Sequence, residues 1–497
     1  MSKSQALPAA LAVLLAACAG SPGYRTSAAP VPAAFRETAR DTARDTLMPP
    51  PPPAAPISDS TVPVVTGPEP TSGSVDQASY WRALNDTTLD RLIVELLRSN
   101  LDVRSALARL RGARGARTET ALDLVPTVTA AGGYTRQRLS NATFPIGGGG
   151  RFPDQDIWDA GFDASWELDL FGRVRRNLQA QGALVDAADA DVRDAQVVLT
   201  AELARTYFEL RGAQERLAVA RRNGENQRRT LDVTQQRLDA GRGTAFDTER
   251  ARTQLGFTLA SIPALEAQVA AAQYAIGVLV GRAPASVATE LVPVAAIPAL
   301  PSDVTVANPD SLVRRRPDVA AAERQAAAEH AFVGAAKADY LPRINVGGSA
   351  GYSASELGGL GDEGTFRYAV GPIISWPLLN LGRVKARVDQ SRARADDADA
   401  QYTQTVLRAL QEVETGLSRY RTSRARVERI RDAAEASERA ADLARLRFEG
   451  GIADFLQVLD AERTQLDAED QLAQAHTDAA TSYAALYQAL GGQVPAP

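Results

Sequence analysis

Two stretches of the chain, "SWELDLFGRVRR" (165–176) and "SWPLLNLGRVKA" (375–386), repeat each other at a displacement of 210 residues. Just before and within the first stretch, residues 162–170 alternate between apolar and polar side chains, which is typical of a half-buried strand. A long segment without proline, 174–240, follows. The repeat therefore predicts that the chain passes from a strand into a very long helix twice.

The long segments carry a coiled-coil pattern. Apolar residues recur every seven positions with a single four-residue shift, and the same register returns 210 residues later. The seam positions are Leu178, Val185, Val192, Leu199, Leu203, Leu210, Leu217, Leu231 and Leu238, and then Val413, Tyr420, Val427, Ala434, Ala441 and Phe448. About 68 residues at 1.5 Å each predict rods of roughly 100 Å.

Glycine turns and further helices complete each half. Turns at 237–243 and 447–454 precede returning helices at about 247–280 and 455–490, and opening helices are expected at about 88–122 and 310–340. Each half thus has the order helix, strand, loop, strand, long helix, turn, helix.

Four strands are predicted in total. They cover 125–138, 162–170, 341–353 and about 368–378, and glycine-rich loops at 139–156 and 354–366 separate the members of each pair. Gly172 and Gly382 are expected to relieve the bends into the rods.

The strands suggest how the chain meets a membrane. Trp166 and Trp376 suit a membrane–water interface, although core positions are the alternative. Asp163, Glu167 and Asp169 lie on the odd face and are expected to line a lumen. Four strands cannot close a barrel, so a dimer with a filled interior or a trimer with an open lumen is required.

The first 75 residues differ from the rest. Residues 1–17 have a weakly positive start and a short apolar run, and "LAAC" ends at Cys18, the only cysteine. This resembles a bacterial lipobox, so lipidation of Cys18 is expected, with a chance cysteine after an ordinary signal peptide as the alternative. Residues 18–75 are rich in proline and alanine, which predicts a linker.

Bulk composition excludes several classes of function. The net charge of −5 disfavours nucleic acid as a partner, and one cysteine and two histidines, His330 and His476, leave little for a metal site. No nucleotide, GxSxG or HExxH motif is present, so neither a cofactor nor enzymatic activity is expected. After the signal stretch, no apolar run long enough for a transmembrane helix is expected.

The motifs resemble one family. The first junction, "RRRPDVAAAER" with "GAAKADYLPRI" (314–344), "LRSNLDVRSALARL" (97–110) and "LDAERTQLDAEDQLA" (459–473) are similar to TolC-like outer-membrane efflux proteins, in the NodT/OprM-like lipoprotein subgroup of resistance-nodulation-division systems. The likeness covers about 78–492. It predicts the segments 76–281 and 310–491 as two repeats, with 282–309 as an equatorial connection and 492–497 as a tail.

The resemblance implies a fold and partners. The fold is mainly α with a transmembrane β contribution, in which a homotrimer combines a 12-stranded β-barrel with a 12-helix α-barrel. It implies a Gram-negative outer membrane with its lipid, a periplasmic tunnel, an adaptor protein and an inner-membrane pump that supplies the energy. The chain would passively conduct drugs or other small toxic compounds outward.

The same resemblance implies a periplasmic gate. Leu456 and Asp460 match positions that form an apolar ring and an acidic ring, and Asp247 matches a latching position of TolC. Phe448 and Ala453 replace the Tyr and Arg of that latch, so the apolar ring is expected to do more. Alternatively, Leu456 is a seam residue and Asp460 a solvated charge.

Other functions stay open. A duct for type I protein secretion has the same architecture. A periplasmic adaptor or coiled-coil scaffold lipoprotein belongs to a different class; two hairpins and alternating strands argue against both.

Overall fold

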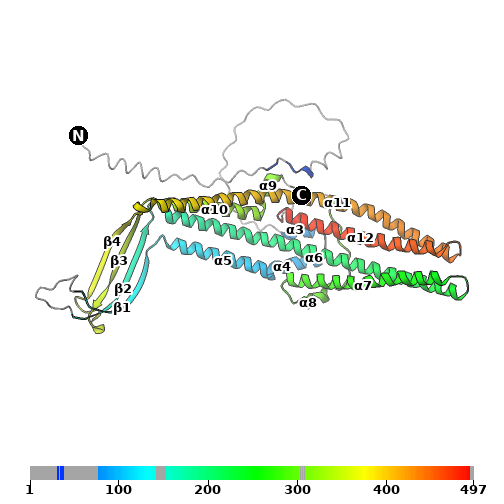
Figure 1. Ribbon diagram of the computed structural model, residues 1–497, viewed down its shortest axis with the longest axis horizontal. Helices are drawn as coiled ribbons and strands as arrows, with labels where there is room; N and C mark the ends of the chain where they lie inside the picture. The colour runs from blue at the N-terminus through cyan, green and yellow to red at the C-terminus, as the bar shows by residue number, and fades with distance from the viewer. Residues whose placement is uncertain are drawn as a thin grey trace, which may run out of the picture. The chain divides into compact units, whose positions relative to one another are not determined.

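The computed structural model describes residues 31–32, 34–37, 77–140, 153–302, 304, 306 and 308–492 (Figure 1). The elements begin with α3 (Gln77–Arg82), α4 (Thr87–Ser99), α5 (Leu101–Leu122), β1 (Thr127–Gln137), β2 (Gln155–Leu168), α6 (Arg173–Asp239) and α7 (Ala245–Leu279). After α8 (Pro284–Ala288) and η1 (Thr289–Leu291) come α9 (Pro309–Arg315), α10 (Pro317–Ala338), β3 (Arg343–Ala354), η2 (Leu357–Gly359), β4 (Phe366–Ser375), η3 (Leu378–Asn380), α11 (Leu381–Glu449) and α12 (Phe455–Ala489).

The described chain forms two compact units that do not coincide with the predicted halves. One contains Ala108–Ala190 and Ala321–Gln404, and the other takes its described residues from Ala29–Leu107, Asp191–Ala320 and Thr405–Pro497. Both long helices, α6 and α11, run through the division. The halves are therefore sequence repeats, and each compact unit is built from parts of both.

The first unit contains an antiparallel sheet in the order β1-β2-β3-β4 (Figure 1). Thr127 pairs with Ser165, Trp158 with Ala354, and Arg343 with Ser375. All four predicted strands are confirmed. β2 starts earlier than predicted, at Gln155, and ends at Leu168, because the next polar residue, Asp169, caps α6 instead of extending the strand.

The predicted repeat is confirmed in the helices. α7 and α12 each contain 35 residues and begin 210 positions apart. The turns before them place Gly241 and Gly451 at φ values of 68° and 74°, a left-handed conformation that glycine adopts at low cost. The six seam positions predicted in the second long helix, from Val413 to Phe448, are all buried.

The two junctions do not bend in the same way. Gly172 has φ 79°, as expected for a residue that relieves the turn into α6. The expectation for Gly382 is wrong, because this residue is the second residue of α11 and has no positive φ. In the second junction Pro377 and η3 make the turn before the helix starts.

The opening helices are each broken once. The predicted helix at 88–122 is α4 and α5, and that at 310–340 is α9 and α10. Asn100 and Arg316 stand at the breaks, 216 residues apart, and both are buried. Asn100 donates a hydrogen bond to the Leu279 carbonyl at the end of α7 (2.8 Å), and Arg316 donates to the Ala489 carbonyl at the end of α12 (2.8 Å).

An aromatic cluster in the second unit joins α3 to α12. The Tyr80 ring stacks on Tyr483 with centroids 4.7 Å apart, and Trp81 lies 4.9 Å from Tyr487. Both α3 residues are buried. Burial of such large rings stabilises the start of the folded body against the C-terminal helix.

Part of the predicted linker packs on the second unit. Phe35 is only 2% exposed, and the backbone N–H groups of Arg36 and Glu37 donate to the Glu414 carboxylate at 2.6 and 3.1 Å. Residues 34–37 of the predicted linker 18–75 thus pack on this unit, through one aromatic side chain that is buried. Cys18 and most of the linker lie outside the described residues.

One described helix, α7, is long and apolar enough to cross a membrane by length and composition. The expectation that no such run follows the signal stretch is wrong by this criterion. A single match of this kind is weak support for a span, since core helices of soluble proteins have the same composition.

Candidate functional site

One face of the sheet is apolar and open. The register pairs residues of equal parity, so even-numbered side chains of all four strands share a face. The exposed apolar residues on that face are Val128, Tyr134, Phe162, Tyr352, Phe366, Tyr368, Val370 and Ile374. Opposite them lie mainly small and polar residues such as Thr129, Asp163 and Ser349. An exposed apolar face of this extent marks a surface that meets lipid or another apolar partner.

The two predicted interface tryptophans make equivalent contacts. The Trp166 indole N–H donates to the Leu124 carbonyl (3.0 Å), and that of Trp376 donates to the Tyr340 carbonyl (3.1 Å). Each acceptor lies between an opening helix and its strand. Both indoles are partly exposed. They therefore tie the start of one strand to the end of the next, and their place at a membrane interface stays a prediction.

The three acidic residues expected to line a lumen differ in their surroundings. Asp163 is exposed within β2. Glu167 accepts two hydrogen bonds from Arg173, at 2.8 and 2.6 Å. Asp169 accepts from the backbone N–H groups of Val174 (3.1 Å) and Arg175 (2.9 Å) and so caps α6. Local contacts thus occupy two of the three, and Asp163 alone is an exposed strand carboxylate among them.

At the first hairpin turn, Asp247 makes a local contact with the residue that caps its helix. Thr244 is the N-cap of α7; its hydroxyl accepts from the Asp247 N–H (3.2 Å) and donates to the Asp247 carboxylate (2.7 Å). This reciprocal pair satisfies a free donor at the helix start. Asp247 therefore stabilises its own helix, and a latching role stays a prediction.

The second hairpin turn presents the two predicted gate residues to the outside of the chain. Phe455 and Val458 face inward and form a buried cluster with Phe448 and Ala251. Leu456 and Asp460 are both exposed. Because they are four positions apart on α12, they share one helical face. Within the single chain Leu456 is not part of the buried cluster, and both its gate role and its alternative role as a seam residue stay predictions.

A residue that sequence reasoning missed joins the two hairpins. Arg237 donates to the Phe448 carbonyl at the end of α11 (2.6 Å), and its guanidinium lies 4.0 Å from the Phe448 ring centroid. A cation at a helix C-terminus is stabilising. The signal in the sequence was an arginine in the last turn of α6, which alone does not name its partner.

Below the turns, buried polar groups bridge α6, α11 and α12. Glu462, which is buried, accepts from the Thr230 hydroxyl (2.7 Å) and from Arg445 (3.1 Å), and Arg445 also donates to Gln465 (3.0 Å). Arg216 pairs with Asp470 at 2.7 Å. Buried polar groups need such partners. These contacts hold the two hairpins in one register near the turns.

Among the described residues, no group of three or more acidic, histidine or cysteine side chains could hold a metal ion. His330 contacts Asp399 (2.9 Å), and His476 lies 3.6 Å from Glu215. Cys18, the predicted lipidation site, lies outside the described residues.

The comparisons with known proteins agree with this geometry. A family model described as "Outer membrane efflux protein" matches residues 92–282 and 308–492. "Outer membrane protein OprJ" of Pseudomonas aeruginosa is 31% identical over 88% of this chain and 91% of its own, and "Nodulation protein T" of Rhizobium leguminosarum bv. trifolii is 27% identical over 96% and 95%. The solved structure of the outer-membrane channel OprN has a TM-score of 0.81 and 37% identity, covering 95% of this chain and 99% of that one. With an open apolar sheet face, two repeated long hairpins and this likeness over nearly its whole described length, the chain belongs to the outer membrane efflux protein family.

Proposed function

We propose that this protein is the outer-membrane exit duct of a tripartite efflux pump and that it works as a homotrimer. Its sheet has four strands with β1 and β4 at the edges, so it needs strands from other copies to close. Three copies supply twelve strands, enough for an open lumen. The observation that carries the proposal is the apolar face of the sheet, which is exposed in the single chain.

The partners and substrates follow by analogy with relatives. "Toluene efflux pump outer membrane protein TtgC" of Pseudomonas putida is 30% identical over 99% of this chain and 96% of its own, and "Antibiotic efflux pump outer membrane protein ArpC" is 31% identical over 83% and 84%. We assign this chain to the same kind of system. It takes small toxic compounds from a periplasmic adaptor and an inner-membrane pump, conducts them passively, and is anchored in the outer membrane by lipid on Cys18.

The hairpin turns form the proposed periplasmic gate. Three exposed Leu456 side chains make an apolar constriction, three Asp460 carboxylates make a cation-attracting ring, and Asp247 lies at the neighbouring turn. The first hairpin carries different residues at the corresponding places, Phe246 and Arg250, with the guanidinium 5.3 Å from the ring centroid. The two turns therefore offer opposite charges at equivalent positions.

Conductance of the purified trimer in planar bilayers tests the gate. Leu456→Ala with Asp460→Ala is expected to raise single-channel conductance and, in cells lacking the pump, susceptibility to large antibiotics. Phe246→Ala is the matched control from the first hairpin and should change conductance less. If the double variant forms normal amounts of trimer but conducts like wild type, the constriction lies elsewhere.

Two further experiments test the assignment itself. Palmitate labelling of wild type should be lost in Cys18→Ser. In cells that lack their own duct, the gene should restore resistance to small toxic compounds when an adaptor and pump are present. Restoration of protein export alone would favour the type I secretion alternative instead.

A further inference from the structure

Within the first compact unit, four helices follow one another in the order of the strands they join. α5 leads into β1, β2 into α6, α10 into β3 and β4 into α11. Contacts between successive helices are made by the pairs Arg117 and Gly182, Ala180 and Ala328, and His330 and Asp399. The order is therefore α5, α6, α10, α11, and the first and last of these helices have a neighbour on one side only among the described residues.

Burial agrees with two open sides. From residue 111 to its end at Leu122, α5 has no buried residue. The buried residues in the first turns of α11, from Val384 to Ala395, recur at intervals of three or four, which places them on one side of that helix. The outer sides of α5 and α11 thus lack a covering element in the single chain.

The sequence repeat indicates what covers them. Residues of α6 and α11 correspond at a displacement of 210, and those of α5 and α10 at 216. The two indole bonds keep both displacements, since Trp166 bonds Leu124 and Trp376 bonds Tyr340. The contact between α6 and α10 therefore has an equivalent with the halves exchanged, between α11 and α5. Because α5 and α11 lie at opposite ends of the order, they make this contact only between copies.

The contact between α6 and α10 brings an arginine near a carboxylate. Arg173 is bonded to Glu167 at 2.8 and 2.6 Å. These bonds raise the pKa of Arg173 most, burial lowers it, and the charge of Asp339, just after α10, raises it further. Asp339 thus lies within electrostatic range of Arg173. The equivalent residues in the exchanged contact are Arg383 at the start of α11 and Asp123 just after α5.

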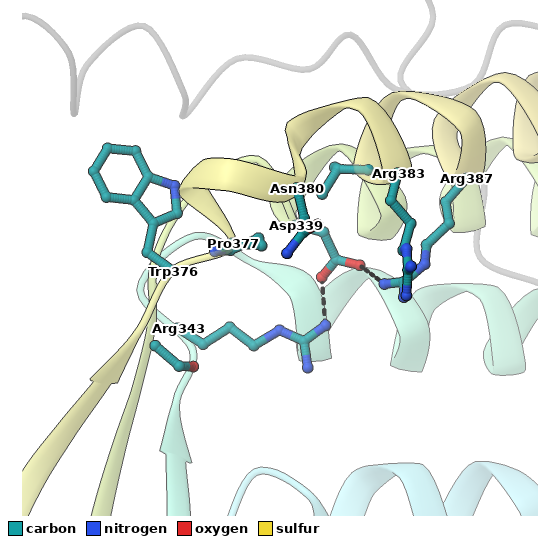
Figure 2. Close-up of a pocket in the computed structure, with 9 residues that line it drawn as sticks. Asp339, Arg343, Trp376, Pro377, Asn380, Arg383 and Arg387 are labelled. Atoms are coloured by element: carbon teal, nitrogen blue, oxygen red, sulfur yellow. Dashed lines mark hydrogen bonds and ion pairs between the residues drawn. The ribbon is translucent and has the colours of Figure 1, made fainter.

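Arg383 lacks the carboxylate that holds its counterpart. Pro377 occupies the position of Glu167. Figure 2 shows the Arg383 guanidinium beside that of Arg387, which pairs with Asp339 at 3.7 Å. Arg383 is exposed, and within the described part of the chain it has neither a hydrogen bond nor an ion pair. Its guanidinium is therefore open to a partner from outside the chain.

Asp123 lacks the arginines that hold its counterpart. Asp339 pairs with Arg343 at 2.6 Å and with Arg387 at 3.7 Å. The corresponding residues of the first half are uncharged and are Thr127 and Asn177. Asp123 is exposed, and among the described residues it too has no hydrogen bond or ion pair. The two halves have thus lost complementary charges, a carboxylate at one open side and two arginines at the other.

Exposed apolar side chains surround both positions. Leu379, four residues before Arg383, is 99% exposed, and Leu122 and Val125 beside Asp123 are 60% and 50% exposed. Exposed apolar surface of this kind is typical of an interface. The edge strands agree, because β4 leads into α11 and β1 follows α5. Joining β4 of one copy to β1 of the next brings the two open sides together.

We propose that Arg383 of each copy forms an ion pair with Asp123 of the neighbouring copy. Opposite charges at this contact fix which side of one copy meets which side of the next. The inference rests on the proposed trimer and names the residues that close it. A wild-type protein that is not a trimer would overturn both, whereas a trimer without this pair would overturn the inference alone.

Charge reversal in the purified full-length protein tests the pair. Arg383→Glu and Asp123→Arg should each lower the midpoint temperature of trimer dissociation in detergent by about 5 °C or more, because like charges then meet. Native electrophoresis after heating measures it. Combining the two substitutions restores opposite charges and should recover most of the wild-type midpoint. The mismatched combination of Arg392→Glu with Asp123→Arg should not, since Arg392 lies nine residues, about 13 Å, further along α11.

Cysteine cross-linking tests the contact directly. Arg383→Cys with Asp123→Cys should join the copies into covalent trimers on treatment with a short bismaleimide, which reaches farther than a disulfide. Either substitution alone, or Arg392→Cys with Asp123→Cys, should leave the copies mainly unlinked.

Two results would overturn the inference while the wild-type protein is a trimer. One is a double charge reversal that is no more stable than the single variants. The other is a trimer of normal abundance in which cysteines at 383 and 123 link no better than the mismatched pair.

Discussion

Asn100 and Arg316 occupy equivalent positions in the two halves and use different chemistry for the same contact. Each bonds the last carbonyl groups of its own returning helix, at Leu279 and at Ala489. Asn100 is neutral and also accepts from two N–H groups at the start of α5 (2.8 and 3.0 Å). Arg316 is charged and needs Asp318 and Glu412 beside it, at 2.7 Å each. Both halves thus connect the break in the opening helix to the end of the returning helix, but they do so with different side chains.

The strand-to-helix junctions show the opposite case, in which identical residues at equivalent positions make different contacts. Arg173 and Arg383 are the same residue at equivalent positions, yet Glu167 holds the first and no described residue pairs with the second. A repeated motif therefore identifies a repeated backbone path. It does not identify a repeated role.

The largest expected effect is at Arg316, the charged residue at the break between α9 and α10. Arg316→Ala removes the contacts to both carboxylates and to the Ala489 carbonyl, and is expected to lower the free energy of unfolding by about 3 kcal/mol. Thermal unfolding followed by circular dichroism measures it. Arg314→Ala is the control; this residue is exposed and pairs with Asp310, so it should cost at most about 0.5 kcal/mol. Equal losses for the two variants would contradict the role given to Arg316.

Asn100, the neutral residue at the break between α4 and α5, is expected to contribute less to stability. Asn100→Ala loses the cap of α5 and the bond to Leu279, which together stabilise by about 1–2 kcal/mol. The same unfolding experiment applies. A loss of unfolding free energy equal to that of Arg316→Ala would show that the bond to the last carbonyl of the returning helix, and not the charge network around Arg316, determines the contribution of these residues.

Loss of the cap at the junction between β2 and α6 should have a local effect. Asp169→Ala frees the backbone N–H groups of Val174 and Arg175, and their hydrogen exchange should accelerate about fivefold, corresponding to roughly 1 kcal/mol. The matching amides in α11, Val384 and Lys385, serve as the internal control because Leu379 offers them no acceptor. Unchanged exchange in α6 would mean that the cap contributes nothing.

The smallest effect is a pH dependence that arises in the second compact unit, at Asp194 of α6. Burial, with Asp318 next in importance, raises the pKa of Asp194 to about 6, while Arg316 lowers it and Asp191 and Glu412 raise it further. The folded protein therefore binds this proton more tightly than the unfolded chain, so its contribution to stability falls as pH rises from about 4 to 6.

Asp194→Asn removes the free-energy cost of keeping a partly buried carboxylate ionised at neutral pH. The variant should be more stable than wild type at pH 7.5, by at most about 1 kcal/mol after allowance for partial exposure, and the difference should vanish below pH 4. The effect of Asn100→Ala should stay constant over the same range, since that residue is neutral. A difference between Asp194→Asn and wild type that grows toward low pH would refute the assignment.

The strands and long helices could be predicted because their signals are local. Alternation over 162–170 and the heptads of the second half each repeat over many residues, and the structure shows β2 and a fully buried seam there. The break at Asn100 was missed because asparagine is not a strong helix breaker, and the carbonyl group that holds it is 179 residues away. The break at Arg316 does have a local signal, which was overlooked: Pro317 begins α10 and disfavours helical backbone at the residue before it.

The sequence by itself determined the repeat, the order of elements and the family, because each depends on periodicity and motif spacing along one chain. Tertiary structure alone decided which polar residues have partners. Glu167 and Asp169 could not be separated from Asp163 by alternation, and Arg383 could not be separated from Arg173 by identity. A side chain's role depends on what lies within hydrogen-bond distance of it. For Glu167 and Asp169 the partners are only five or six residues away, but it is the bend of the folded junction that brings them within reach.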